Sequence, residues 1–164
     1  MIDQDGYRAN VGIMLSNDQG ELLWARRFGR DGWQFPQGGI QKDETPQQAL
    51  YRELKEEVGL DPNEVEIIDS TNDWLRYDLP KNLQRPSSKP ICVGQKQIWF
   101  LLKLISSSSN IKLDCSEKPE FDTWRWIEPH LAAEQVIEFK RSVYRMALST
   151  LLPDVEIILD NSSL

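Results

Sequence analysis

One segment of the sequence, residues 46–58, carries the signals of a helix at both of its ends. Thr45 stands before Pro46, and Gln48 lies three residues after Thr45, which is the pattern of a capping box with proline at the first helical position. Gly59 then supplies the residue type that commonly ends a helix. No other segment is marked as clearly, so the fold must accommodate a helix here.

Two stripes of side chains run next to each other along this helix. One stripe is apolar and is predicted to face the core; it consists of Leu50, Leu54 and Val58. The other is acidic and consists of Glu53, Glu56 and Glu57. Like charges at this spacing repel each other, and their repulsion is screened weakly at the border of a core. A bound divalent cation would relieve it, and oxygen ligands favour magnesium or manganese over zinc.

The residues around the helix strengthen this interpretation. A solvated acidic face is the usual explanation for a cluster of glutamates. Here, however, Gly38 and Gly39 precede the helix and let the backbone pass close to whatever the carboxylates hold. Glu44 adds a further carboxylate on the loop that enters the helix, and Arg52 can pair with Glu56 four residues later and orient it.

The rest of the chain predicts a sheet on which this helix can pack. Runs of apolar, β-branched or aromatic residues predict strands at residues 11–15, 22–25, 65–69, 74–77, 98–105 and 123–127. Turn residues at 17–20 join the first two strands into a hairpin, and the segment 79–90 is a loop. A second helix is predicted near residues 138–152, before Pro153. This order predicts an α/β fold with a mixed sheet between helical layers.

Length and composition limit the remaining possibilities. With 164 residues, of which 40% are hydrophobic and 27% charged, we expect one domain at residues 6–150 and a C-terminal tail at residues 151–164. The formal charge of −7 argues against a protein that coats nucleic acid. No apolar window is long enough for a membrane helix, and the first residues lack the features of a signal peptide. We therefore expect a cytoplasmic protein without a membrane partner.

The sequence has too few cysteines and histidines for a zinc site or for catalysis that depends on histidine. Cys92, Cys115 and His130 are the only cysteines and histidine, and they cannot assemble a zinc site. A serine or cysteine nucleophile would have to recruit His130, which we expect on the surface beside Pro129. The acidic helix remains the best candidate for chemistry.

The glycines, the loop acid and the helix together match a known signature. The pattern Gly38-x5-Glu44-x7-Arg52-Glu53-Leu54-x-Glu56-Glu57-x-Gly59-Leu60, with Gly39 inside it, matches the Nudix box, so the chain resembles the Nudix hydrolases. This resemblance implies an α/β/α sandwich with a mixed sheet and cation-dependent hydrolysis of nucleoside diphosphate derivatives. It also implies that Glu53 and Glu57 bind metal and that Glu56 is a ligand or the base that activates water. Arg52 belongs to the same catalytic group by resemblance.

Segments outside the box are similar to a bacterial subfamily that removes pyrophosphate from the triphosphorylated 5′ end of RNA, a step that promotes RNA decay. They are residues 1–3, 6–8, 24–27, 33–37, 74–77, 94–97 and 139–141. The implied partner is the 5′ end of single-stranded RNA, and not duplex DNA; protein partners are left open. Dinucleoside polyphosphates such as diadenosine tetraphosphate are the alternative substrates. A Nudix fold that binds nucleotides without turnover is a third hypothesis, which the intact acid triad disfavours.

The same resemblance implies which residues bind substrate and complete the metal site. The substrate-binding residues would be Arg8, Arg27, Gln37, Phe139 and Lys140. Phe139 also falls on the apolar stripe of the second helix, so stacking on a base and a place in the core are both open. Glu120 would be a further metal ligand, with an ordinary turn carboxylate as the alternative. The acidic tail is not expected to contact the substrate.

Overall fold

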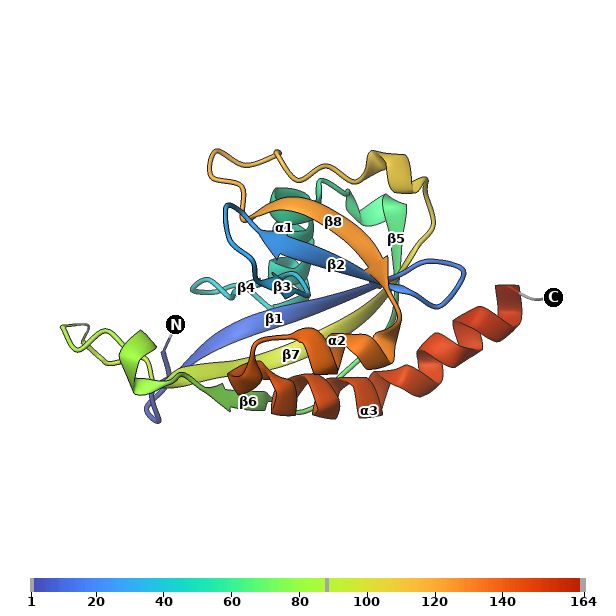
Figure 1. The fold of residues 1–164 in the computed structure, drawn as a ribbon. Coiled ribbons are helices and arrows are strands. Elements are labelled where there is room, and N and C mark those ends of the chain that lie inside the picture. Colours follow the sequence, from blue (N-terminus) through green and yellow to red (C-terminus); the bar gives the residue numbers. More distant parts are fainter. Residues whose placement is uncertain (1, 88, 163–164) are drawn as a thin grey trace.

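An eight-stranded mixed sheet forms the centre of the computed structural model, which describes residues 2–87 and 89–162 (Figure 1). Its strands are β1 (Tyr7–Ser16), β2 (Leu22–Arg27), β3 (Trp33–Gln34), β4 (Gln37–Gly39), β5 (Val65–Ser70), β6 (Leu75–Asp78), β7 (Gly94–Leu104) and β8 (Phe121–Ile127). The main path runs β3-β2-β1-β7-β5, while β4 pairs with β1, β6 with β7 and β8 with β2. β1 and β7 are parallel and the other pairs are antiparallel, so the predicted mixed sheet is confirmed.

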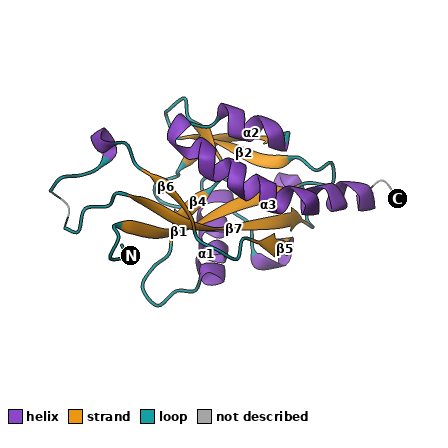
Figure 2. Cartoon of the chain, turned by 90° about the horizontal axis from the view of Figure 1, so that it is seen from below, coloured by secondary structure: helices purple, strands orange, loops and turns teal. Residues whose placement is uncertain are grey.

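Helices cover both faces of the sheet. They are α1 (Pro46–Val58), α2 (Pro129–Gln135) and α3 (Glu138–Ser162), with 3-10 turns at Pro62–Glu64, Lys81–Leu83 and Ser108–Asn110. α1 lies on one face, and α2 and α3 lie together on the other, as the two views show (Figure 1, Figure 2). The predicted α/β/α sandwich is confirmed, and α1 begins and ends at the predicted residues.

Successive side chains of β1 point to opposite faces of the sheet and pack against both helical layers. Val11, Ile13 and Leu15 are fully buried on the α1 side, whereas Met14 belongs to the core on the α3 side. At Gly12 the indole of Trp99 on β7 takes the place of a side chain, because a Cβ there would meet the ring at well under 3.0 Å. The sheet therefore lies between two apolar cores. β4 pairs with β1 and is followed in the chain by α1.

The last helix is longer than the sequence predicts. We expected it to end before Pro153, yet α3 continues to Ser162 with Pro153 inside it. A proline in a helix interior costs about 3 kcal/mol, but Val155 and Ile158 are almost fully buried in the α3-side core, and each contributes about 1.5–3 kcal/mol. Residues 151–162 of the expected tail are thus helical, and Leu151, Val155 and Ile158 of this stretch pack in the core. Residues 163 and 164 of that tail, Met1 and residue 88 lie outside the described residues.

Three short elements escaped sequence interpretation. β3, β4 and α2 are too short to show a period, and β4 carries two glycines, which predict a loop. β1 and β7 also begin earlier than expected, because their first residues do not form the apolar runs on which the prediction relied. Within the described residues, no helix has the length and apolar character needed to cross a bilayer.

Candidate active site

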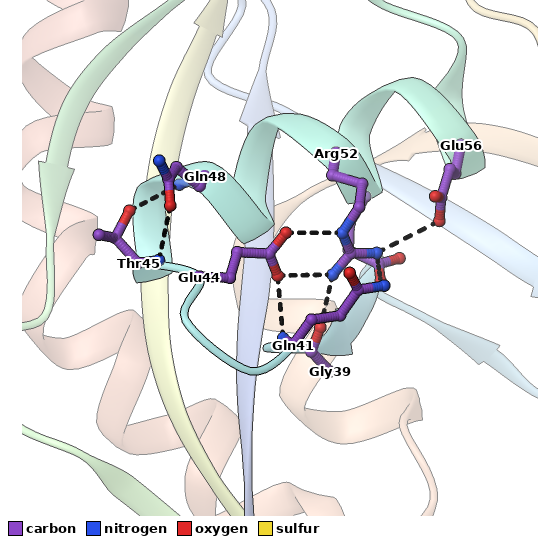
Figure 3. A network of polar contacts seen from close by, with 8 residues as sticks. Gly39, Gln41, Glu44, Thr45, Gln48, Arg52 and Glu56 are labelled. Atoms are coloured by element: carbon purple, nitrogen blue, oxygen red, sulfur yellow. Dashed lines mark hydrogen bonds and ion pairs between the residues drawn. The ribbon is translucent and has the colours of Figure 1, made fainter. Parts of the chain in front are cut away.

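Caps at both ends hold α1 in place. Thr45 Oγ1 accepts a hydrogen bond from the Gln48 backbone N–H at 3.1 Å, and Gln48 Oε1 accepts one from the Thr45 N–H at 2.9 Å (Figure 3). Gly59 adopts the left-handed conformation with a φ of 78°, and its N–H bonds to the Leu54 carbonyl. These caps set where the acidic stripe of the helix meets the sheet.

Arg52 joins α1 to the loop that precedes it (Figure 3). Its Nε donates to Glu44 Oε2 at 2.8 Å and its Nη2 to Glu44 Oε1 at 2.9 Å, which makes the pair bidentate. Nη2 also donates to the Gly39 carbonyl at 2.7 Å, and Nη1 to Glu53 Oε1 at 2.8 Å. The contact with Glu56 is the longest, at 3.4 Å. Arg52 therefore orients Glu44 and Glu53 more closely than the Glu56 that the sequence suggested.

Glu44 is engaged by this arginine and by the backbone. The Arg52 guanidinium lowers the pKa of Glu44 to about 2, helped by the Gln41 N–H that donates to Glu44 Oε1 at 2.9 Å. Glu44 is thus an ionised structural carboxylate that fastens the loop to α1. It is not part of the acid cluster that could hold a metal.

Three carboxylates of α1 do converge. Glu53, Glu56 and Glu57 each place one oxygen within 4.8 Å of the others. Burial raises the pKa of Glu53, which is 8% exposed, against the opposing effect of Arg52. Burial also raises the pKa of Glu57 to about 7, with added repulsion from Glu53 and Glu120. Among the described residues Glu57 Oε2 is buried without a hydrogen-bond partner. Arg52 pairs with Glu53 and, at a longer distance, with Glu56, whereas Glu57 has no ion pair among the described residues, so the cluster keeps negative charge that a cation could neutralise.

The glycine pair before α1 works differently from the prediction. The Glu53 carboxylate fills the space beside Gly38, so the backbone passes close to the glutamate itself. Gly39 has no heavy atom near the position of a Cβ, and its contribution is the carbonyl bound by Arg52. Of the two glycines, only Gly38 is needed for the backbone to pass close to the Glu53 carboxylate.

A cleft of about 480 Å³ opens beside the acid cluster. Its lining residues come from β2 and the loop after it, β3, β4, α1, β6, the 79–83 segment, β7, the loop before β8 and α3. They are Arg27, Arg30, Gln34, Gln37, Gly38, Glu53, Glu57, Tyr77, Leu79, Leu83, Gln95, Glu120, Phe139 and Lys140. Most of the residues that the sequence assigned to metal or substrate are therefore brought together, including Glu120, whose Oε1 lies 3.8 Å from Arg27 Nε.

One wall of the cleft is built around a buried lysine. Lys140 is 8% exposed, and its Nζ donates to Gln34 Oε1 at 3.1 Å and to Gln37 Oε1 at 3.4 Å. Burial lowers the pKa of Lys140 to about 8, with a further contribution from Arg27. The Phe139 ring is partly buried against the core, and its centroid lies 5.9 Å from that of Tyr77. Phe139 thus packs against the core and also lines the cleft.

Two of the residues predicted to bind metal or substrate, Arg8 and Glu56, are not among those that line this cleft. Arg8 lines an adjoining pocket of about 250 Å³ that shares Leu79, Leu83 and Gln95 with it. Glu56 belongs to the acid cluster but not to the cleft lining. Arg8 is therefore close to the site without facing the carboxylates directly.

Several cleft residues were not singled out from the sequence. They are Gln34, Tyr77, Leu79, Leu83 and Gln95, and also Arg30, which was one of many candidate basic residues. Gln34 and Gln37 flank Phe35-Pro36 in a segment otherwise rich in apolar residues, and polar residues in such a position are a signal that could have been followed.

Comparison with protein families matches residues 6–147 to the NUDIX domain. The chain belongs to the Nudix family. This Nudix hydrolase is 60% identical over 153 residues to an RNA pyrophosphohydrolase of Marinomonas sp. (strain MWYL1), which covers 93% of this chain and 95% of that protein. Nudix hydrolases use divalent metals, and α1 carries an acidic cluster of the kind that could hold one.

Solved structures of low identity share the fold of this Nudix hydrolase. The dihydroneopterin triphosphate pyrophosphohydrolase of E. coli has a TM-score of 0.66 at 22% identity, over 85% of this chain and 95% of that one. The Ap4A hydrolase of C. elegans has a TM-score of 0.63 at 18% identity, over 90% of this chain and 98% of that one. At these identities the likeness extends to the fold alone.

Proposed function

We propose that this Nudix hydrolase removes pyrophosphate from the triphosphorylated 5′ end of single-stranded RNA in the cytoplasm and so promotes RNA decay. The observation that carries the proposal is the cleft, which Glu53 and Glu57 of the acid cluster line together with Arg27, Lys140 and the rings of Tyr77 and Phe139. The 60% identical Marinomonas protein that bears the name RNA pyrophosphohydrolase supports the same substrate.

The carboxylates fit a divalent cation, which we take to be Mg²⁺, with Mn²⁺ as the alternative. Every donor is a carboxylate oxygen, which suits a hard cation, and the buried Glu57 Oε2 has no partner among the described residues. The residues that would hold the ion are Glu53, Glu56, Glu57 and Glu120. When bound, the cation polarises a phosphoryl oxygen and lowers the pKa of a water ligand.

Arg52 acts on this chemistry through the glutamates. Its guanidinium is occupied by Glu44, Glu53 and the Gly39 carbonyl, so it presents no free donor fork to a phosphate. We propose that its role is to position the Glu53 carboxylate. Glu44 supports the arginine in that role.

The polyphosphate binds to the basic wall of the cleft. Among the described residues Lys140 Nζ bonds to two neutral amide oxygens and lies over the Tyr77 ring but has no ion pair, so its charge is available to a phosphate. With a pKa of about 8, the amine of Lys140 is mostly protonated at neutral pH. Arg27 adds a second cation from β2 and Arg8 a third from the adjoining pocket.

A base of the RNA would pack at the mouth of the same cleft. Phe139 presents an aromatic ring there, and the planar guanidinium of Arg27 can stack on a base. Such packing on both faces of a base favours an unpaired nucleotide, because a base in a duplex is held by its partner strand and covered by the next base pair. This is our reason for proposing a single-stranded 5′ end.

The decisive experiment compares substrates with Mg²⁺ present. We expect pyrophosphate release from a 5′-triphosphorylated oligoribonucleotide, and loss of that release in Glu53→Gln. Intact RNA ends together with fast cleavage of diadenosine tetraphosphate would assign the chain to dinucleoside polyphosphates instead. Tight binding of either compound without product would contradict hydrolysis of both.

A further inference from the structure

A chain of polar side chains runs from the buried core to the cleft. Trp99 Nε1 donates to Gln97 Oε1 at 3.1 Å. Gln97 Nε2 then donates to Asn10 Oδ1 at 2.8 Å and to Gln37 Oε1 at 3.4 Å. Trp99 and Gln97 are fully buried and Asn10 nearly so, whereas Gln37 lines the cleft. The chain therefore connects the core of β7 to the substrate wall.

The direction of every hydrogen bond in this chain follows from one group. The indole N–H of Trp99 can only donate, so Gln97 must turn Oε1 toward it and Nε2 toward Gln37. Gln37 must then present Oε1 to Gln97, which leaves its Nε2 to donate to the Tyr77 hydroxyl at 3.2 Å. The oxygen and nitrogen of an amide have nearly the same shape, so the orientation of Gln37 is set by its two donors, the Gln97 amide and the Lys140 ammonium, both of which need the Gln37 oxygen.

This orientation matters because the same Gln37 oxygen accepts from Lys140. Lys140 Nζ has two acceptors among the described residues, Gln34 Oε1 and Gln37 Oε1. If the Gln37 amide turned over, an NH₂ group would face the ammonium and one of those acceptors would be lost. A buried cation without acceptors is costly, so Lys140 would move away from its place at the cleft wall.

We infer that Gln97 is a positioning residue, which fixes the orientation of Gln37 and thereby the place of the Lys140 ammonium. The inference rests on the proposed function in so far as Lys140 binds the RNA triphosphate. Gln97 does not line the cleft and acts only through Gln37.

The orientation itself is tested by NMR without any measurement of activity. In the wild type we expect nuclear Overhauser contacts between the Gln37 side-chain amide protons and the Tyr77 ring. In Gln97→Glu, residue 97 can only accept, so the Gln37 nitrogen should turn toward it and those contacts should be replaced by contacts to Lys140. Persistence of the Tyr77 contacts in a folded Gln97→Glu variant would overturn the inference.

The consequence for substrate is tested with Gln97→Met, which keeps the length of the side chain and introduces no charge. We expect KM for triphosphorylated RNA to rise about five- to tenfold, the effect of about one hydrogen bond, with little change in kcat. The matched control is Leu101→Val, a core change on the same face of β7, which should lower the melting temperature without raising KM. An unchanged KM in Gln97→Met would overturn the inference.

A double substitution separates a positioning role from a merely structural one. If Gln97 acts through Gln37, Gln97→Met should add almost nothing to KM in a Gln37→Met background. Full additivity would show that Gln97 acts on KM by another route and would refute the positioning role. If wild-type protein releases no pyrophosphate from RNA, the proposed function fails, while the NMR measurement still decides the orientation of Gln37.

Discussion

The carboxylate of Glu53 occupies the space that a side chain on Gly38 would need. A Cβ built on Gly38 would lie well under 3.0 Å from the carboxyl carbon and both oxygens of Glu53, whereas one built on Gly39 meets no heavy atom within 4 Å. Residue 38 must therefore be a glycine, because the Glu53 side chain of α1 packs directly against β4 at this position.

Gly38→Ala should displace the Glu53 carboxylate and with it the cation. Because a misplacement of about 1 Å at a reacting centre costs about 100-fold, we expect the rate on triphosphorylated RNA to fall by about that factor. Gly39→Ala is the matched control and should keep a rate near that of the wild type. Equal losses in the two variants would contradict the steric explanation.

Removal of the metal should lower the stability of the folded protein. A cation that binds only the folded state at 100 times its Kd adds about 2.7 kcal/mol, so saturating Mg²⁺ should raise the melting temperature by roughly 5–10 °C. Glu53→Gln and Glu57→Gln should lose most of this increment. Calorimetry of each variant with Mg²⁺ or with EDTA makes the comparison; a full increment in both variants would rule out these ligands.

In the metal-free protein Glu57 should make stability fall as pH rises. Burial holds the pKa of Glu57 at about 7 in the folded state, above the ordinary value of 4.5, so the folded state binds the proton more tightly. Its contribution is present below pH 4.5 and is lost as pH rises through 7. Urea unfolding in EDTA across this range should show the loss, and Glu57→Gln should flatten it.

Glu44 should have the opposite dependence on pH. Arg52 holds the pKa of Glu44 at about 2, below the ordinary 4.5, so the folded state favours the ionised form. The stability it contributes is present above pH 4.5 and is lost as pH falls toward 2. Glu44→Gln should lower the free energy of unfolding at pH 7 by roughly 1.5–3 kcal/mol, the typical value of a charged hydrogen bond, and by less at pH 3. A difference that does not shrink between pH 7 and pH 3 would contradict this role.

Arg27→Ala should distinguish recognition of a base from binding of phosphate. If Arg27 stacks on a base, its loss should weaken pyrophosphate release from triphosphorylated RNA by about 1–3 kcal/mol and spare a nucleoside triphosphate. Equal losses on both substrates would assign Arg27 to the phosphates. Arg26→Ala is the matched control, because Arg26 is paired with Asp122 at 2.9 Å and does not line the cleft.

The parts of this protein that sequence could predict are those governed by local rules. Thr45, Gln48 and Gly59 mark α1 because capping depends on neighbours within a few residues, and the helix occurs where they place it. The spacing of Glu53, Glu56 and Glu57 likewise predicts their convergence, because a helix fixes it.

The parts that sequence missed depend on contacts between distant segments. Pro153 predicts the end of a helix, and only the burial of Val155 and Ile158 against the sheet explains why α3 continues. In the same way, nothing local to Gln34 or Tyr77 indicates that Lys140, far along the chain, lies against them.

The parallel pairing of β1 with β7 determines when this site can exist. Asn10 meets Gln97 across 87 positions of sequence, and the cleft then needs Glu120, just before β8, and Lys140 from α3. Pairings between such distant segments form slowly, and domains dominated by them fold in milliseconds to seconds. A ribosome that has synthesised the chain only as far as Leu60 has therefore produced every residue of the box but no cleft. The nascent chain can act on RNA only after α3 has been synthesised and has docked.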